Sequence, residues 1–202
     1  MQTTKIERAL VSVTDKTIIN KFCKGLDFLG VEILSTGGTA NTLRQAQIEV
    51  KEVSEFTKFP EIFSGRLKTI HPKIAGGLLF DRNNALHVEQ AKKNGIKPID
   101  MVVVNLYQFI DAIKKGGKNH NQMVELIDIG GVGLIRAAAK NYKYVTVVTD
   151  INDYKMITDE MKKFRGQISE RTNFFLAMKA FQLTAQYDVA ISAYMALEFC
   201  KL

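Results

Sequence analysis

One stretch of this sequence constrains the fold more than any other, the apolar run Met-Val-Val-Val at residues 101–104. A continuous apolar run is typical of a strand that is buried on both faces, whereas a half-exposed strand alternates apolar and polar residues. Strand-like runs also occur at residues 8–13, 31–34 and 144–148, and helical patterns separate them. This alternation predicts an α/β fold whose parallel or mostly parallel sheet is covered by helices on both faces.

Periodicity and capping residues predict the remaining segments. Two further strands are expected at residues 50–53 and 74–80. Helices are expected at residues 14–29, 39–46, 84–94, 121–127 and 131–141. From Ser169 onward the chain is expected to be helical, in two pieces that meet near Asp188.

Length and composition favour a single domain over residues 1–202. With 202 residues, 46% of them hydrophobic, the chain can bury one sizeable core, and no linker-like or repeated segment divides it. No stretch approaches the ~20 apolar residues of a membrane span, and no signal-peptide core is present at the N-terminus. Cys23 and Cys200 make no disulfide framework. A reduced, cytoplasmic protein without membrane contact is therefore expected.

The formal net charge of +7 brings nucleic-acid binding into consideration. The lysines are dispersed, however, and the pairs at residues 92–93, 114–115 and 162–163 fall on helix-like segments that are typical of solvated faces. A nucleotide phosphate needs only two or three of these charges. We therefore expect a small anionic ligand and no nucleic-acid partner.

Two polar segments with glycines could bind such an anion. Residues 35–39, Ser-Thr-Gly-Gly-Thr, lie between a predicted strand and a predicted helix, where backbone amides and hydroxyls can hold a phosphate. Residues 64–72 place Arg66, Lys68, Thr69 and His71 in one short loop. Residue types alone leave the alternatives open, which are an ordinary capped turn for the first segment and a solvated basic loop for the second.

Two other segments are candidate pocket residues. Asn105 and Tyr107 follow the apolar run, at the strand end where ligands of parallel sheets bind, although Tyr107 could equally be an aromatic residue at the sheet edge. Gly130 and Gly131 begin a predicted helix with Lys140 in its last turn, and that helix either faces a ligand or only packs on the sheet.

Motifs for metal and cofactor chemistry are missing from the sequence. The histidines His71, His87 and His120 have no metal-ligand spacing. The chain has no GxxxxGK[ST] loop, no strand-borne GxGxxG and no GxSxG. We expect neither a metal nor a cofactor.

Taken in order, six strings identify a family resemblance. They are SVTDK (12–16), STGGTA (35–40), VSEFTKFPEIFSGRLKTIHPKIAGGLL (53–79), VVNLYQF (103–109), DIGGVGLIRAAAKN (128–141) and KAFQLTAQYDVAISAY (179–194). Together they resemble the cyclohydrolase domain of the bifunctional AICAR transformylase/IMP cyclohydrolase over nearly the whole chain. The resemblance implies a three-layer α/β/α fold of the methylglyoxal synthase type. It also implies that the larger transformylase domain, and with it formyl transfer, is absent.

The resemblance further implies the reaction, which is closure of FAICAR to IMP with loss of water, without metal or cofactor. The implied catalytic residues are Lys68, Tyr107, Asp128 and Lys140. The implied substrate-binding residues are Thr14, Asp15, Lys16, Thr36, Gly37, Gly38, Thr39, Arg66, Thr69, Val104, Asn105, Ile129 and Gly130. Which of Lys68, Asp128 and Lys140 moves which proton is left open.

Two other functions on the same fold are alternatives, methylglyoxal synthase and a nucleotide-sensing regulatory domain. A regulatory domain would keep an anion-binding loop but would have no need for Lys68, Tyr107 and Asp128. The apolar residues of the segment 173–199 exceed what one helical stripe of ~100° can hide, which predicts a homodimer formed through this segment.

Overall fold

The protein, as a computed structural model, is described for residues 3–106 and 108–201. Five parallel strands form its central sheet in the order β4-β3-β2-β5-β6. Their bounds are β2 (Arg8–Ser12), β3 (Glu32–Ser35), β4 (Lys51–Glu52), β5 (Met101–Val104) and β6 (Thr146–Val148). Leu10 of β2 lies beside Leu34 of β3 and Val102 of β5, so β2 is the middle strand. The chain builds outward from β2 in one direction to β4 and then in the other direction to β6.

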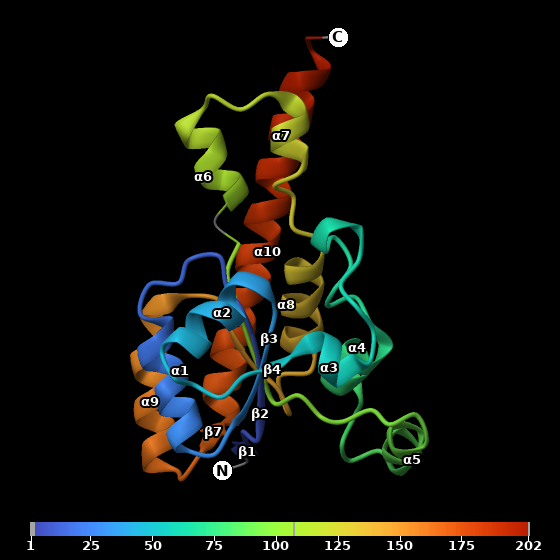
Figure 1. Ribbon diagram of the computed structural model, residues 1–202, viewed down its shortest axis with the longest axis vertical. Helices are drawn as coiled ribbons and strands as arrows, with labels where there is room; N and C mark the ends of the chain where they lie inside the picture. Colours follow the sequence, from blue (N-terminus) through green and yellow to red (C-terminus); the bar gives the residue numbers. More distant parts are fainter. Residues whose placement is uncertain (1–2, 107, 202) are drawn as a thin grey trace.

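Helices cover both faces of this sheet, so the three-layer α/β/α fold is confirmed (Figure 1). On one side lie α1 (Ile19–Phe28), α2 (Gly37–Gln45) and α9 (Tyr154–Lys163). On the other side lie α4 (Pro72–Leu79) and α8 (Gly130–Lys140), and α10 (Glu170–Phe199) packs along α8 and the edge strand β6.

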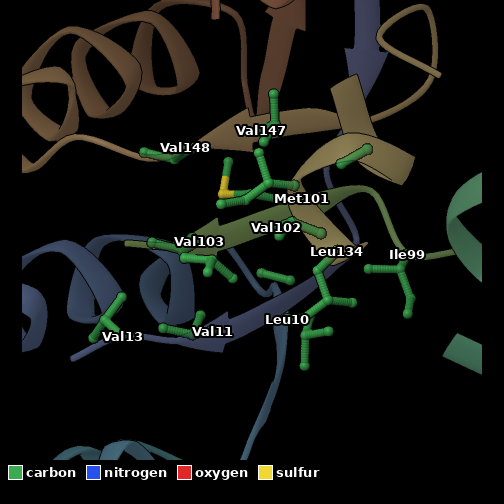
Figure 2. Close-up of a cluster of buried hydrophobic side chains, with 14 of the residues drawn as sticks. Leu10, Val11, Val13, Ile99, Met101, Val102, Val103, Leu134, Val147 and Val148 are labelled. Carbon is green, nitrogen blue, oxygen red and sulfur yellow. The ribbon is translucent and has the colours of Figure 1, made fainter. Parts of the chain in front are cut away.

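The core lies between β5 and its neighbours, as the apolar run predicts. All four residues of β5 are buried, and Val102 and Val103 are at most 1% exposed (Figure 2). Leu134 of α8 packs over this strand together with Leu10 and Ile99 (Figure 2). Burying a side chain of this size stabilises the fold by roughly 1.5–3 kcal/mol, so this layer holds β5 in place.

The predicted strand at residues 74–80 is wrong, because this segment is the helix α4. His71 caps α4 by accepting the Lys73 N–H on its Nδ1 at 3.1 Å, and Pro72 occupies the first helical turn. A short apolar run cannot be assigned to strand or helix by periodicity alone. The strand expected at 50–53 shrinks to the two residues of β4, because the helix α3 (Val53–Thr57) begins directly after it.

The C-terminal segment is one helix of 30 residues rather than two pieces. Ser169 caps its first turn by accepting the Thr172 N–H at 3.3 Å. The far half of α10 extends beyond the sheet, and α6 (Gln108–Lys115) and α7 (His120–Val124) lie beside it there (Figure 1). Among the described residues, none of the helices combines the length and the apolar character of a membrane span.

Several elements were not anticipated. They are α3, the short turns η1 (Phe63–Gly65) and η2 (Ile151–Asp153), and a small antiparallel sheet of β1 (Thr3–Lys5) and β7 (Gln167–Ser169). The helix-like segments around residues 114–115 and 162–163 are the ends of α6 and α9. The helix α5 (Ala85–Lys93) begins where expected, because Asn84 caps it by accepting the N–H groups of Leu86 and His87. The helix expected from residue 14 begins only at Ile19, which leaves residues 13–18 as a loop after β2.

Candidate functional site

A cavity of about 680 Å³ lies at the carboxyl ends of β2, β3 and β5. This is the point where the strand order reverses, the usual ligand position in open parallel sheets. Most of the predicted site residues line it, namely Thr14, Lys16, Thr36, Gly38, Thr39, Arg66, Lys68, Thr69, Val104, Asn105, Asp128, Ile129 and Gly130. Segments that are far apart in the sequence thus meet around one space.

Three predicted residues that the structure describes do not line the cavity. Asp15 and Gly37 are the direct chain neighbours of lining residues. Lys140 is exposed at the opposite end of α8 from Gly130, roughly 15 Å away along an 11-residue helix. Tyr107 lies outside the described residues. Lys140 therefore has no geometric support as a catalytic residue of this cavity.

The turn between β3 and α2 forms one wall. Gly37 has a φ of +47°, a left-handed conformation that glycine adopts without a steric penalty. The first amides of α2 have no partner within the helix, and the positive end of its dipole faces the same way. Thr39 fixes the turn to β2, because its hydroxyl donates to the Val13 carbonyl at 3.0 Å and accepts the Val13 N–H at 3.2 Å. This wall can hold an anion.

Asn105 holds the loop after β2 in place. Its Oδ1 accepts the N–H groups of Thr14 at 2.9 Å and Asp15 at 3.2 Å, and its Nδ2 donates to the Asp15 carbonyl at 3.1 Å. The side chain is only 3% exposed, and both ends of its amide are used in these bonds. Its side chain therefore shapes the cavity by fixing the backbone of residues 14 and 15.

The opposite wall carries the basic loop. An isolated bridge between Ile62 and Leu67 closes a tight turn in which Phe63 and Ser64 have φ values of 55° and 53°. Positive φ is costly for residues other than glycine, so this turn is held by its surroundings. Arg66, from the same loop, forms an ion pair with Glu125. Lys68 lines the cavity beside them.

Asp128 and two glycines form the floor beneath the basic loop. The carboxylate of Asp128 accepts the Gly131 N–H on Oδ1 at 2.6 Å and so caps the start of α8. A Cβ at Gly131 would overlap that carboxylate, and a Cβ at Gly130 would lie 2.8 Å from the hydroxyl oxygen of Thr69. Only glycine lets α8 begin this close to both side chains. Within the described residues, Oδ2 of Asp128 accepts no hydrogen bond and is available to a ligand.

The cavity carries charges of both signs, with three cations and two carboxylates in its lining. Lys16, Arg66 and Lys68 supply positive charge, whereas Glu125 and Asp128 supply negative charge. Hydrogen bonds from the side chain and backbone of Thr17 hold the pKa of Asp15 below its usual value, so that carboxylate is ionised at neutral pH. Across residues 3–106 and 108–201, no three His, Cys, Asp or Glu side chains are grouped as ligands of one metal ion.

Sequence reasoning missed several residues that line the cavity, among them the charged Glu125, and it missed Tyr187, which contacts the lining from outside. Glu125 had no motif to mark it. Tyr187 was assigned to the apolar dimer face of the segment 173–199, but the structure buries it within the chain, where its hydroxyl accepts the Asp128 N–H at 2.8 Å. Tyr187 and Asp128 are 59 residues apart in the sequence, so no local pattern could have paired them.

The fold and its cavity define an α/β/α domain with a cavity at the switch point of a parallel sheet. The family model of the MGS-like domain matches residues 19–133, which is more than half of the chain. The chain therefore belongs to the family of MGS-like domains. A second model, the AICARFT/IMPCHase bienzyme, matches residues 138–200.

Similar proteins agree with both models. The chain is 53% identical over 191 residues to the Bifunctional purine biosynthesis protein PurH of Chlorobium chlorochromatii (strain CaD3), covering 95% of this chain and 36% of that protein. It is 53% identical over 190 residues to the protein of the same name from Leptospira biflexa, covering 94% and 37%. The chain thus spans about a third of the length of these relatives. The sequence resemblance described above is confirmed.

A solved structure is also similar. The chain aligns with the crystal structure of ForH with a TM-score of 0.82 and 28% sequence identity, covering 93% of this chain and 97% of that one. This likeness extends over the sheet and the helical layers together.

Proposed function

We propose that this chain is an IMP cyclohydrolase, which closes FAICAR to IMP with release of water. The observation that carries the proposal is the meeting of Lys68 and Asp128 in one cavity with the anion-binding start of α2. Support comes also from the match to the AICARFT/IMPCHase bienzyme and from relatives named for purine biosynthesis.

The main requirement of the proposed reaction is the orientation of its two reacting groups, more than the strength of the nucleophile. The carboxamide nitrogen adds to the formyl carbon, a C–N bond forms, and one amide proton moves to the former carbonyl oxygen. The resulting hydroxyl then leaves as water together with the proton of the formamido nitrogen, and a C=N bond remains. Holding both groups in contact can supply several kcal/mol of the barrier, about 7–11 kcal/mol in the best intramolecular reactions.

Residues on the two walls of the cavity have different roles in this reaction. The turn at residues 36–39 and Lys16 hold the phosphate of the nucleotide, because the start of α2 supplies amides and the Lys16 side chain lies beside Gly38. Lys68 stabilises the charge that develops on the formyl oxygen, together with the backbone amide of Asn105. Asp128 presents a free carboxylate oxygen to the carboxamide and can orient it or accept its proton.

The decisive test is direct turnover. The purified chain is incubated with FAICAR, and IMP is followed by its ultraviolet absorbance, with Lys68→Ala as the control protein. Formation of IMP by the wild-type chain at a rate above the control supports the proposal. Absence of IMP rejects it, and methylglyoxal production or IMP binding without turnover would favour the synthase or the regulatory alternative instead.

We also propose that two copies pair through α10. Large apolar side chains are exposed along this helix, namely Phe174, Phe175, Met178, Phe181, Val189, Met195, Leu197 and Phe199. Exposed apolar patches of this extent are typical of interfaces, and twofold pairing is the commonest way to cover them. Light scattering at micromolar concentration tests this, because a mass near 22.7 kDa rather than twice that value would reject the dimer.

A further inference from the structure

Tyr187 joins the long helix α10 to the segment that carries Asp128. Its side chain is 1% exposed, and its hydroxyl accepts the N–H of Asp128 at 2.8 Å. The same hydroxyl donates to the carbonyl oxygen of Leu126 at 3.4 Å. One oxygen atom thus holds both ends of the short turn 126–128, which lines the cavity between α7 and α8.

The hydroxyl of Tyr187 stays protonated at neutral pH and can keep donating. Burial raises its pKa above the usual value, whereas the hydrogen bond from the Asp128 backbone acts in the opposite direction. A buried amide without an acceptor is costly, so the position of Asp128 depends on this oxygen. Because the Asp128 carboxylate in turn caps α8 through Gly131, displacement of the turn would move the carboxylate as well.

The ring of Tyr187 has a separate packing role. It packs edge-on against Phe109 with ring centroids 6.1 Å apart, and Phe109 is fully buried. Phe109 lies in α6, in the segment that follows β5 at the cavity. Tyr187 therefore contacts the turn 126–128 through its hydroxyl and α6 through its ring. A phenylalanine keeps the ring contact and removes only the hydroxyl.

We propose that Tyr187 is a positioning residue, whose hydroxyl fixes the turn 126–128 so that the Asp128 carboxylate meets the ligand. The expected effect on turnover rests on the proposed cyclohydrolase function, whereas the expected effect on the position of the turn 126–128 does not. Tyr187 itself does not line the cavity and, on this view, does not touch the reacting atoms; it contacts the backbone of the lining residues Leu126 and Asp128. It acts through Asp128, and its loss should lower turnover more than substrate binding.

The test compares Tyr187→Phe with a matched variant, Tyr144→Phe. The Tyr144 hydroxyl donates to Oδ1 of Asp81 at 2.7 Å, away from the cavity lining, so this control also loses one tyrosine hydrogen bond. Two quantities are measured on all three proteins: amide hydrogen exchange of the segment 126–131, and the kcat and KM for FAICAR. Thermal unfolding monitored by circular dichroism verifies that each variant is folded.

We expect exchange of the segment 126–131 to accelerate by about tenfold in Tyr187→Phe and to stay unchanged in Tyr144→Phe. We expect kcat to fall by up to about 100-fold with KM nearly unchanged, since an error of ~1 Å in a reacting group has that effect. Unchanged exchange, or accelerated exchange with wild-type kcat, would overturn the positioning role. If the wild-type chain makes no IMP, the proposed function fails, and the exchange comparison still decides whether Tyr187 holds the turn.

Discussion

Arg66 and Glu125 form an ion pair between the basic loop and the turn that leads to Asp128. Both side chains line the cavity, and they are 69% and 58% exposed. Exposed ion pairs contribute only about 0–1 kcal/mol, so Arg66 can exchange its carboxylate partner for a phosphate or carboxylate of a ligand at little cost. The ion pair therefore lies at the edge of the cavity and can separate at little cost in free energy.

Replacing Glu125 with Gln should therefore improve ligand binding. Arg66 loses its competing partner, and we expect KM for FAICAR to fall by about two- to fivefold with kcat unchanged, the equivalent of ~0.4–1 kcal/mol. Steady-state kinetics at low and high salt measure the change, which should shrink as salt screens the charges. Glu89→Gln, on the exposed surface of α5, is the control. A higher KM in Glu125→Gln would contradict this prediction.

Lys68→Ala and Asp128→Asn should each remove most of the turnover while the fold stays intact. Asparagine keeps an oxygen that can accept the Gly131 N–H, so Asp128→Asn tests the charge and leaves the cap of α8 in place. Loss of a general acid or base lowers the rate by about 10²–10⁴-fold, and we expect kcat to fall within that range. Near-wild-type turnover by either folded variant would remove that residue from the mechanism.

Two glycines of α8 should respond in opposite ways to alanine. At Gly133 a Cβ meets nothing within 4 Å, so Gly133→Ala should stabilise the helix by up to about 1 kcal/mol and leave activity unchanged. At Gly131 a Cβ overlaps the Asp128 carboxylate, so Gly131→Ala should displace that group and lower kcat. Thermal unfolding and turnover of the two variants are compared side by side. Equal activity of both would show that the close approach of Asp128 to α8 is dispensable.

His71 should make stability depend on pH. Burial, with a smaller contribution from the charge of Lys73, lowers its pKa below the usual 6.5. The neutral ring accepts the Lys73 N–H and caps α4. This stability is complete above pH 6.5 and is lost as the pH falls through the lowered pKa of the folded state. His71→Asn keeps a capping oxygen that does not titrate.

The measurement is the difference in unfolding free energy between wild type and His71→Asn from pH 7.5 to pH 5. We expect wild type to lose about 1 kcal/mol relative to the variant, the usual value of a helix cap. The difference cancels every pH-dependent contribution that the two proteins share. A difference that stays constant with pH would mean that the His71 ring does not act as the cap.

Sequence patterns predicted the parts of this fold that depend on residues close to one another in the sequence. The run 101–104 identified the buried strand, and glycines next to hydroxyls identified the turn of residues 36–39, because burial on both faces and helix starts leave local signals. The segment 74–80 failed because its apolar residues suit a strand and a helix equally, and only the cap by His71 and Pro72 decides between them.

Contacts between distant segments left no such signal. Tyr187 was placed correctly in an apolar helix, but its hydroxyl bond to Asp128 depends on how α10 crosses the sheet edge. Lys140 shares a motif with Asp128, yet the straight course of α8 carries it away from the cavity. A motif records which residues occur together in the chain, whereas only the path of the backbone decides which of them meet.

The reversal of strand order at β2 has a consequence for how this domain can change. The wall proposed to hold the anion is formed by residues 12–39, whereas Lys68 and Asp128 belong to later stretches of the chain. Substitutions can therefore rework the reactive wall and leave the anchoring wall as it is. A domain divided in this way can acquire a new reaction on a similarly charged metabolite while its anion-binding residues stay unchanged.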